Sequence, residues 1–337
     1  MKIGFFELEG WEQEQISAAL PGQELSFSKE KITAAALPEQ RDFEVMSVFV
    51  NSRLDAQVLS AFPNLKCIAT RSTGYDHIDL AECKKRGITV VYVPGYGDNT
   101  VAEFAFGLLL NLTRHMYRAI DEIKQSGSFA LSELRGIDLA HKTIGVVGTG
   151  RIGKKMIRIC KGFEMEVIAT DPYPDMKAAA ELGYTYVSFE DLLKRTDVIT
   201  FHCLYTSENR HLLNKENIGL MKKGSYVINT ARGALIETEA LVDALKRGDL
   251  AGAGLDVLED ENETKAAIGG SLPEGLSEES RRVVQLNQEL VKMPNVLITP
   301  HTAFNSQEAL VRILTTALGD IAGFTKGQIV NQVPDER

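Results

Sequence analysis

From Lys142 onward, short apolar runs alternate with segments whose apolar residues recur at helical spacing. Apolar runs bounded by polar residues predict buried strands, whereas apolar residues three and four positions apart predict amphipathic helices. Alternation of this kind is typical of a parallel, doubly wound sheet that carries helices on both faces. The predicted strands are TIGVVG (143–148), EVIATD (166–171), DVITFH (197–202), SYVINT (225–230), AGAGLDV (251–257) and NVLIT (295–299).

The segments between these strands carry helix signals. RIGKKMIRICKGF has an apolar face and is predicted to end near Gly162, and Ser188 suits the N-cap of a helix in SFEDLLKRT. NKENIGLMKKG is also expected to be helical. The helix in IETEALVDALKRG is predicted to end at Gly248, because glycine readily adopts the left-handed conformation that closes a helix.

The first hundred residues show the same pattern in a weaker form. The runs KIGFFE, EVMSVFV, LKCIATRS and ITVVYV predict strands, and HIDLAECKKRG predicts a helix that ends at Gly87. Two further helices are expected, one from Thr100 to about Arg118 and one from about Ser306 to Gly323. The second of them carries the chain back to the first part, which we therefore expect to be discontinuous.

These patterns predict an α/β fold with two doubly wound parallel-sheet domains and an active-site cleft between them. The first domain is expected to comprise residues 1–99 and 304–337, and the second residues 100–303. A chain of 337 residues also favours two cores over one. The polar, Glu-rich stretch 262–290 is interpreted as an insertion, in which ESRRVVQLNQELVK is the segment with helical spacing.

Composition narrows the functional classes. The net charge of −9 and the isoelectric point near 5.3 argue against a surface for nucleic acid or anionic membrane, because such a surface needs a basic face. MKIGFFELEGWEQEQ lacks the apolar stretch of a signal peptide, and VAEFAFGLLLNL is too short to span a bilayer. No cysteine or histidine pair has metal-ligand spacing. We therefore expect a cytoplasmic protein without a membrane, nucleic-acid or metal partner.

The segment GTGRIG indicates a cofactor. It places Gly148, Gly150 and Gly153 in the pattern GxGxxG, with Thr149 inside the turn as a further cofactor-binding residue. A lone triplet is weak evidence, and a strand–helix turn that binds nothing is the alternative. This one follows a predicted strand and opens a predicted helix, where backbone N–H groups can bind a pyrophosphate. Asp171, at the end of the next strand, can accept hydrogen bonds from ribose hydroxyls and would repel a 2′-phosphate, so NAD is predicted rather than NADP.

Three side chains after other strand ends suit hydride transfer to a 2-keto acid. They are Arg232 in NTARG, Glu261 in GLDVLEDE and His301 in TPHTAF. A guanidinium can bind the substrate carboxylate through two parallel hydrogen bonds. A protonated imidazole can deliver a proton to the carbonyl oxygen, and a carboxylate beside it orients the ring and favours its charged form. A Rossmann fold alone would also suit a mononucleotide or a methyl donor, so these groups decide between the alternatives.

Each of the three residues also has a structural interpretation. Arg232 could be a surface arginine, Glu261 one of several acids in EDENE, and His301 a histidine that caps a strand. Their common position after strand ends, downstream of the dinucleotide motif, favours catalysis, because carboxyl ends of parallel strands share one edge of the sheet. His202 ends another of these strands and is expected to line the adenine pocket.

The chain resembles the D-isomer-specific 2-hydroxyacid dehydrogenases, and within them the D-lactate dehydrogenase branch. HTAF and the long segment between Glu261 and Pro294 are the features that favour this branch. The resemblance implies a Rossmann NAD-binding domain, a flavodoxin-like substrate domain, and Arg232, Glu261 and His301 as the catalytic set. It covers nearly the whole chain and rests on TRSTGYDHIDL, VAEFAFGLLL, GVVGTGRIG, the Asp171 strand end, INTARGALIETEAL, AGLDVLEDE and NVLITPHTAF.

The resemblance also implies further binding residues. Those for the cofactor are Arg151 and Ile152 at the pyrophosphate, Cys203, Leu204 and Asn209 on the adenine side, Thr230 and Ala231 at the nicotinamide, and Asp256 at its carboxamide. Those for the substrate are the backbone amides of Thr73 and Gly74, the guanidinium of Arg232, and the side chains of Tyr96 and Phe304. Members of this family form dimers or higher homo-oligomers, which is the expectation for this chain.

The function that the resemblance implies is NADH-dependent reduction of a 2-keto acid to a D-2-hydroxy acid, with pyruvate to D-lactate as the leading case. Asn51 and the loop PGYGDN differ from the pattern usual in lactate-type members. Phenylpyruvate, a branched-chain keto acid or glyoxylate are therefore alternative substrates. A protein that senses NAD(H) by binding it, as corepressors related to the family do, is the alternative from another functional class.

Overall fold

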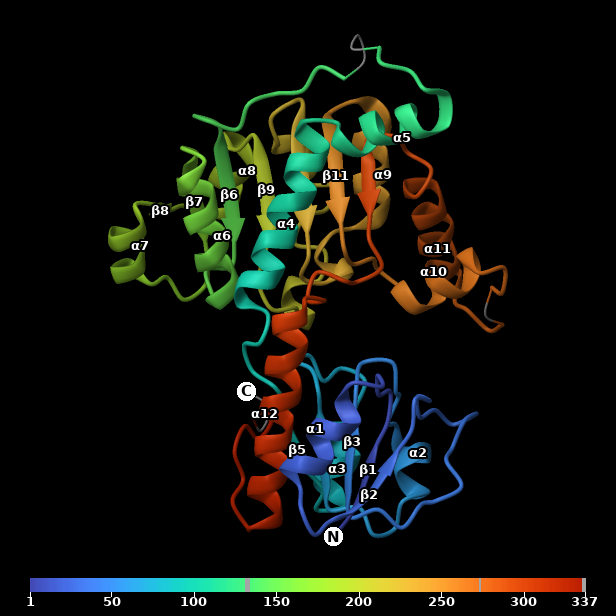
Figure 1. Ribbon diagram of the computed structural model, residues 1–337. Coiled ribbons are helices and arrows are strands. Elements are labelled where there is room, and N and C mark those ends of the chain that lie inside the picture. The colour runs from blue at the N-terminus through green and yellow to red at the C-terminus, as the bar shows by residue number, and fades with distance from the viewer. Residues whose placement is uncertain (131–133, 273, 335–337) are drawn as a thin grey trace. The chain divides into compact units, whose positions relative to one another are not determined.

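The computed structural model of the chain describes residues 1–130, 134–272 and 274–334. The chain forms two compact units, which are Met1–Tyr96 with Ser306–Arg337, and Gly97–Asn305. Each unit is built on one parallel sheet with helices against it (Figure 1). The first unit is thus discontinuous, and the chain passes between the units after Tyr96 and after Asn305, where the sequence placed the limits at 99 and 303.

The first unit contains a five-stranded parallel sheet in the order β2-β1-β3-β4-β5. This is the flavodoxin-like strand order, in which the chain starts near one edge, steps outward once and then crosses to the other side. The bounds are β1 Lys2–Phe5, α1 Glu12–Ala19, β2 Glu24–Phe27, β3 Val45–Val48, α2 Ala56–Ser60, β4 Cys67–Thr70, α3 Leu80–Lys85, β5 Thr89–Val91 and α12 Gln307–Thr325.

Each face of this sheet has its own core because successive strand side chains point in opposite directions. Val45, Cys67 and Ala69 pack with α1 and with the α12 residues Leu314, Leu318 and Ile321 on one face. Met46, Val48 and Ile68 pack with residues of α2 and α3 on the other. Helix α12 therefore belongs to the first unit although it follows the second in sequence.

The second unit contains a seven-stranded parallel sheet in the order β12-β11-β10-β9-β6-β7-β8. Read from β6, this is the doubly wound Rossmann order with one added strand at the edge. The bounds are α4 Asp98–Thr113, α5 Met116–Ser126, β6 Thr143–Val147, α6 Arg151–Gly162, β7 Glu166–Thr170, α7 Met176–Leu182, β8 Thr185–Tyr186, α8 Phe189–Arg195, β9 Val198–Phe201, β10 Ser225–Asn229, α9 Thr238–Arg247, β11 Leu250–Leu255, α10 Glu261–Ile268, α11 Glu278–Leu290 and β12 Val296–Ile298. Three 3₁₀ turns lie at Ser207–Asn209, Ile218–Leu220 and Gly233–Leu235.

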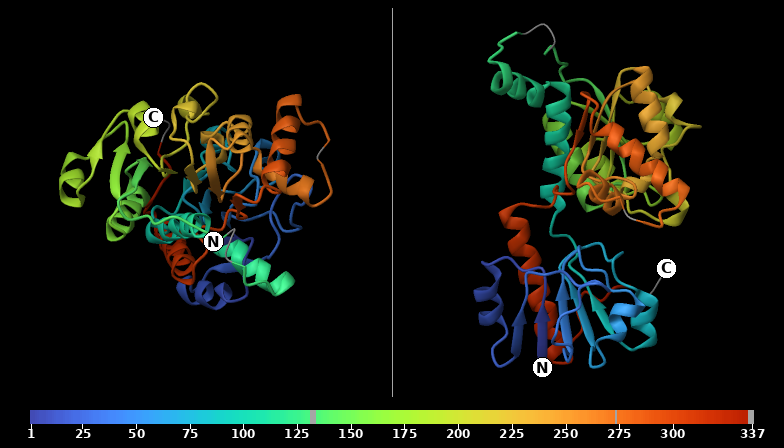
Figure 2. Two further views of the ribbon diagram at one scale, coloured as in Figure 1. Left: turned by 90° about the horizontal axis from the view of Figure 1, so that it is seen from above. Right: turned by 90° about the vertical axis from the view of Figure 1, so that its right-hand side faces the viewer.

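Helices cover both faces of this sheet, as the two further views show (Figure 2). Residues of α4 and α6 pack on one face, where Ile144, Val146 and Val167 point. Residues of α8, α9 and α11 pack on the opposite face, where Val147, Ile168 and Ile199 point. The carboxyl ends of the strands therefore project from a rigid two-sided support.

Local signals begin or end several helices where the sequence predicted. The Ser188 hydroxyl accepts a hydrogen bond from the backbone N–H of Asp191 at the start of α8, which confirms it as the N-cap. Gly248 closes α9 with a φ of 71°, and Gly87 follows α3 with a φ of 68°. Ser306 caps α12 through its hydroxyl. Each residue satisfies or redirects the backbone where a helix must begin or stop.

Other expectations are wrong in detail. The single helix predicted from Thr100 to about Arg118 is two helices, because His115 adopts the left-handed conformation between α4 and α5. NKENIGLMKKG forms only the 3₁₀ turn Ile218–Leu220, since the Asn217 side chain bonds the backbone of Asn214 and Leu212 just before it. The stretch 262–290 holds α10 and α11 rather than one helix, and its residue Pro273 lies outside the described residues.

Candidate active site

Three glycines shape the turn between β6 and α6. Gly148 has a φ of 90°, and a Cβ there would lie 2.5 Å from the backbone nitrogen of Cys203. A Cβ on Gly153 would lie 2.0 Å from the carbonyl oxygen of Gly148. At Gly150, the N-cap of α6, an added Cβ would meet no atom of the described residues within 4 Å. The turn is thus tightly packed on its inner side and open at a helix N-terminus, which suits a pyrophosphate.

Asp171 follows β7 and holds this turn in place. Its Oδ2 accepts hydrogen bonds from the backbone N–H of Thr149 at 2.6 Å and from the Thr149 hydroxyl at 3.0 Å. Its Oδ1 accepts one from the backbone N–H of Tyr173 at 2.8 Å. An ionised carboxylate has about four acceptor positions, so it can still accept a ribose hydroxyl. The glycine turn and this carboxylate together fit NAD.

The residues expected on the adenine side follow β9. The backbone N–H of His202 donates to Val147, and burial lowers the pKa of its imidazole to about 4. Its Nε2 lies 2.9 Å from the hydroxyl of Thr200. Cys203 packs beside Gly148, and burial raises the pKa of its thiol to about 11. A neutral imidazole and a protonated thiol make this wall of the turn uncharged at neutral pH.

The loop after Cys203 is closed by a side chain. Asn209 accepts a hydrogen bond from the backbone N–H of Thr206 at 2.8 Å and donates one to the Leu204 carbonyl at 2.7 Å. Leu204 itself is 83% exposed. Asn209 therefore shapes the loop, and a direct contact of either residue with adenine remains a prediction.

Arg151 and Ile152 begin α6 and differ in their surroundings. The Arg151 guanidinium donates to Asp98, at the start of α4, with an Nε–Oδ2 distance of 2.8 Å. Ile152 packs against the core on the α4 and α6 face. Both lie at the helix N-terminus where the pyrophosphate is expected.

Asn229, at the end of β10, fixes the backbone of the segment with Arg232. Its Oδ1 accepts from the N–H of Ala231 at 3.0 Å, and its Nδ2 donates to the carbonyl of Arg232 at 2.9 Å. The Arg232 guanidinium donates to the carbonyl of Ala231 at 2.9 Å. Thr230 lies in this segment, and its hydroxyl oxygen is buried without a hydrogen bond among the described residues.

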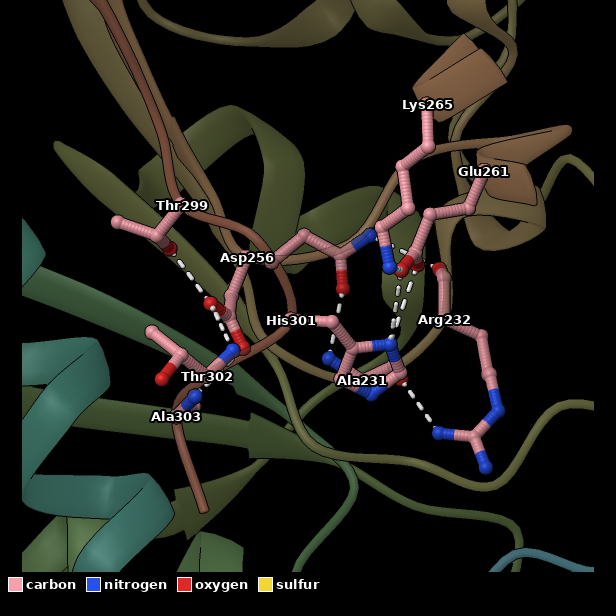
Figure 3. A network of polar contacts seen from close by, with 10 residues as sticks. Ala231, Arg232, Asp256, Glu261, Lys265, Thr299, His301, Thr302 and Ala303 are labelled. Atoms are coloured by element: carbon pink, nitrogen blue, oxygen red, sulfur yellow. Dashed lines mark hydrogen bonds and ion pairs between the residues drawn. The ribbon is translucent and has the colours of Figure 1, made fainter. Parts of the chain in front are cut away.

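His301 and Glu261 are brought together, although 40 positions separate them. The His301 Nδ1 lies 3.2 Å from Oε1 and 3.1 Å from Oε2 of Glu261, as Figure 3 shows. Their side chains are 40% and 20% exposed. Within the described part of the chain, the hydrogen bonds of the His301 ring are those through Nδ1. The other ring nitrogen can therefore serve a substrate.

Glu261 carries a second cationic neighbour. Lys265, one helical turn further along α10, donates to its Oε1 at 2.6 Å. Burial alone would raise the pKa of Glu261, but the hydrogen bonds and charges of His301 and Lys265 outweigh it and hold that pKa below its ordinary value. The carboxylate is thus ionised at neutral pH and favours a protonated imidazole.

Asp256, after β11, holds the backbone loop that carries His301. Its Oδ1 accepts from the Thr299 hydroxyl at 2.5 Å and the Thr302 N–H at 2.9 Å, and its Oδ2 accepts from the Ala303 N–H at 2.8 Å (Figure 3). Burial raises the pKa of Asp256, and these donors oppose the shift. The family resemblance did not imply that Asp256 bonds this loop. The contact of Asp256 with the nicotinamide carboxamide, which the resemblance did imply, remains a prediction.

The predicted substrate residues divide between the two units. Thr73, Gly74 and Tyr96 lie in the first unit beyond the carboxyl ends of β4 and β5. The Thr73 hydroxyl donates to the Val93 carbonyl at 2.7 Å, which leaves its backbone N–H for another partner. Arg232 and the partly buried Phe304 lie in the second unit.

Sequence reasoning missed two groups near these residues. Lys265 had a signal, because a lysine four positions after a glutamate on a helix forms an ion pair. The partners of Glu259, which are Arg210, His211 and Thr238, had none, since they come from two segments distant from it in sequence.

Two surveys of the described residues gave no site. They contain no group of three or more His, Cys, Asp or Glu side chains placed to hold a metal ion. None of their helices has the length and apolarity needed to cross a membrane. Localisation and oligomeric state remain predictions.

Comparisons with known proteins identify the family of the chain. Residues 106–303 match the family described as D-isomer specific 2-hydroxyacid dehydrogenase, NAD binding domain. The chain belongs to this family, and it is an NAD-dependent dehydrogenase of D-2-hydroxy acids.

Individual relatives cover nearly all of the chain. It is similar to the D-lactate dehydrogenase of Escherichia coli, with 36% identity over 97% of this chain and 98% of that protein. The glyoxylate reductase of Thermococcus litoralis is 36% identical over 87% of this chain and 84% of that protein. The crystal structure of the Aquifex aeolicus D-lactate dehydrogenase with NAD and lactic acid has a TM-score of 0.85 and 36% identity, covering 99% of this chain and 100% of that one.

Proposed function

We propose that this enzyme reduces pyruvate to D-lactate, with His301 as the proton donor. The contact between His301 Nδ1 and the Glu261 carboxylate is the observation that carries this proposal. It gives one ring nitrogen a fixed partner of opposite charge and leaves the other available, which is the arrangement that a general acid needs.

The proton and the hydride have separate sources. When bound, NADH supplies the hydride that adds to C2 of the keto acid. His301 gives the proton of its free ring nitrogen to the carbonyl oxygen and becomes neutral, so the C=O double bond becomes a C–O single bond as one C–H and one O–H bond form. Glu261 stabilises the protonated ring before the transfer and fixes its orientation. In the reverse direction, neutral His301 accepts the hydroxyl proton.

Arg232 is proposed to bind the substrate carboxylate. A guanidinium offers parallel donors to two oxygen atoms, and it can also polarise the neighbouring carbonyl. The side-chain bonds of Asn229 fix the backbone on both sides of Arg232, which limits the positions that the guanidinium can reach. Backbone amides at Thr73 and Gly74 are proposed as further donors, with Tyr96 and Phe304 beside the substrate side chain.

Pyruvate is favoured over other keto acids by the relatives. The E. coli and A. aeolicus D-lactate dehydrogenases match this chain nearly from end to end. The glyoxylate reductase of T. litoralis matches at the same identity over a smaller share of the chain. Glyoxylate is therefore the second candidate substrate.

The test is NADH oxidation with a panel of 2-keto acids, followed by the absorbance of the reduced nicotinamide. Pyruvate, glyoxylate, phenylpyruvate and a branched-chain keto acid are compared by kcat/KM, and NADPH is tested beside NADH. We expect the highest value with pyruvate and NADH, and D-lactate as the product on chiral analysis.

Other outcomes contradict defined parts of the proposal. A higher kcat/KM with glyoxylate or a larger keto acid would keep the chemistry and reject pyruvate. Tight binding of NADH without turnover of any keto acid would reject the enzymatic role of His301 and favour a protein that senses NAD(H).

A further inference from the structure

Glu259 is a buried carboxylate two positions before Glu261. Its side chain is only 6% exposed. Oε1 accepts hydrogen bonds from Arg210 at 3.1 Å and from the His211 Nε2 at 2.7 Å, and Oε2 accepts one from the Thr238 hydroxyl at 2.9 Å. Both oxygens are therefore engaged by partners from one loop and from the first turn of α9. A carboxylate so enclosed cannot reach a substrate.

The backbone next to Glu259 is fixed from a second direction. Asn287, fully buried in α11, donates through Nδ2 to the carbonyl oxygen of Glu259 at 2.8 Å. The same Nδ2 lies 2.8 Å from the hydroxyl of Thr264 in α10. One amide thus joins the turn before α10 to the body of α10, which begins with Glu261.

The turn also packs directly on the segment that carries Arg232. A Cβ on Gly233 would lie 1.9 Å from the carbonyl carbon of Leu258 and 2.1 Å from the backbone nitrogen of Glu259. Only glycine permits this approach, because such distances are far below a van der Waals contact. A shift of the turn would therefore displace both the Glu261 and the Arg232 segments.

The link between the two glutamates is stiff. Asp260, the one residue between them, has a φ of 47° and a ψ of 48°, a left-handed conformation in which a non-glycine residue is strained. Such a conformation persists only where its neighbours hold it. The bonds to Glu259 on one side and the start of α10 on the other do so.

We propose that Glu259, held by Arg210, His211 and Thr238, is a positioning residue that sets the place of the Glu261 carboxylate against His301. This rests on the proposed function of His301 and Glu261. Glu259 touches no reacting atom and acts through the turn 258–261. His211, although it pairs with a glutamate, belongs to this support and not to proton transfer.

The test is a double-mutant cycle of Glu259→Ala and Glu261→Gln in the full-length enzyme. Rates are normalised to the concentration of NADH-binding sites, found by fluorescence titration, so that loss of folded protein does not count. We expect Glu259→Ala alone to lower kcat about 30-fold, since small misplacements of catalytic groups have effects of this order. In the Glu261→Gln background, we expect Glu259→Ala to lower kcat less than about threefold, because the Glu261 carboxylate that Glu259 positions is already absent.

Three further readouts separate positioning from general stability. The NADH dissociation constant stays within about threefold of the wild type, since the nucleotide turn is untouched. The KM for the keto acid stays within about threefold of the wild type, since Glu259 touches no substrate atom. Glu259→Gln restores most of the rate, since its Oε1 can accept from Arg210 and His211 while its amide donates to Thr238.

Matched variants keep the test valid if Glu259→Ala does not fold. His211→Leu and Thr238→Val each remove one donor to Glu259, and each lowers kcat about fivefold by the same route. The control is Glu279→Gln, which removes the charge of the exposed second partner of Arg210 and leaves the rate unchanged.

Two results overturn the proposal. One is an equal loss of kcat from Glu259→Ala, or from the single-donor variants, in both the wild-type and Glu261→Gln backgrounds. The other is a wild-type kcat per NADH site in all of them. A Glu261→Gln enzyme with wild-type kcat would instead reject the proposed function, and this is seen before Glu259 is altered.

Discussion

Two histidine–glutamate pairs share one short turn through their glutamates, Glu259 and Glu261, and differ in their surroundings. The His301–Glu261 pair has side chains that are 40% and 20% exposed, with contacts of 3.1 and 3.2 Å. The His211–Glu259 pair is 25% and 6% exposed, with a contact of 2.7 Å. Both histidines have left-handed backbones, with φ values of 54° and 56°. Neither the residue types nor the backbone tells the pairs apart.

The surroundings of the two glutamates make the difference. Glu259 accepts hydrogen bonds from a guanidinium, an imidazole and a hydroxyl, so both of its oxygens are already bonded within the protein. Glu261 receives only the imidazole and one partly exposed ammonium among the described residues. A histidine–carboxylate pair is therefore a structural tie where the carboxylate is saturated and buried. It can serve as the proposed acid–base group where the imidazole keeps a free, accessible nitrogen.

The largest expected contrast is in turnover. His301→Gln should lower kcat for keto-acid reduction about 1000-fold, because the general acid is lost, while NADH binding is retained. His211→Gln keeps a donor to Glu259 and should stay within about threefold of wild type. Steady-state kinetics and NADH fluorescence titration measure both. Similar losses in the two variants would erase the distinction between the pairs.

Stability should show the opposite contrast. Glu259→Ala leaves the buried Thr238 hydroxyl and the partly exposed His211 imidazole without their acceptor, removes one of the two partners of Arg210, and should cost about 3 kcal/mol of unfolding free energy. Glu261→Ala removes a more exposed pair and should cost about 1 kcal/mol or less. Urea unfolding followed by circular dichroism gives both values. A larger loss of unfolding free energy from Glu261→Ala would show that His301–Glu261, and not His211–Glu259, is the pair that stabilises the fold.

The smallest contrast is in pH dependence. Reduction needs protonated His301 and should weaken as pH rises, whereas oxidation needs the neutral ring and should weaken as pH falls. The pKa of Glu261 lies below its ordinary value, so its carboxylate adds no second transition in the neutral range. His211→Gln should leave the profile in place, and a shift there would give His211 a part in proton transfer.

The sequence predicted the fold where apolar runs were long. The strands of the second unit lie within the predicted ranges to within a residue or two at their ends, because buried parallel strands read as continuous apolar runs. Strand β2 and the two-residue strand β8 were missed, since they are short and partly polar. No glycine or proline beside His115 indicated a break between two helices. The break depends on tertiary packing, because α4 buries seven side chains and α5 buries none.

The sequence likewise predicted only part of the candidate site. Position after a strand end pointed to His301 and Glu261, and the structure places them in contact. The same rule could not find His211 and Glu259, because His211 lies in a loop and its partner stands 48 positions away. Asp256 came from family resemblance with one role, and its bonds to Thr299, Thr302 and Ala303 appear only once the loop is folded.

The four cysteines have a practical consequence. Burial raises the pKa of Cys67 and Cys160 to about 12, and that of Cys83 and Cys203 to about 11. At neutral pH, about one thiol in ten thousand or fewer is then in the reactive thiolate form. A cysteine introduced on the surface of each unit would take up a maleimide dye with little background labelling. A pair of fluorophores can thus be attached at two chosen surface positions with no native cysteine replaced.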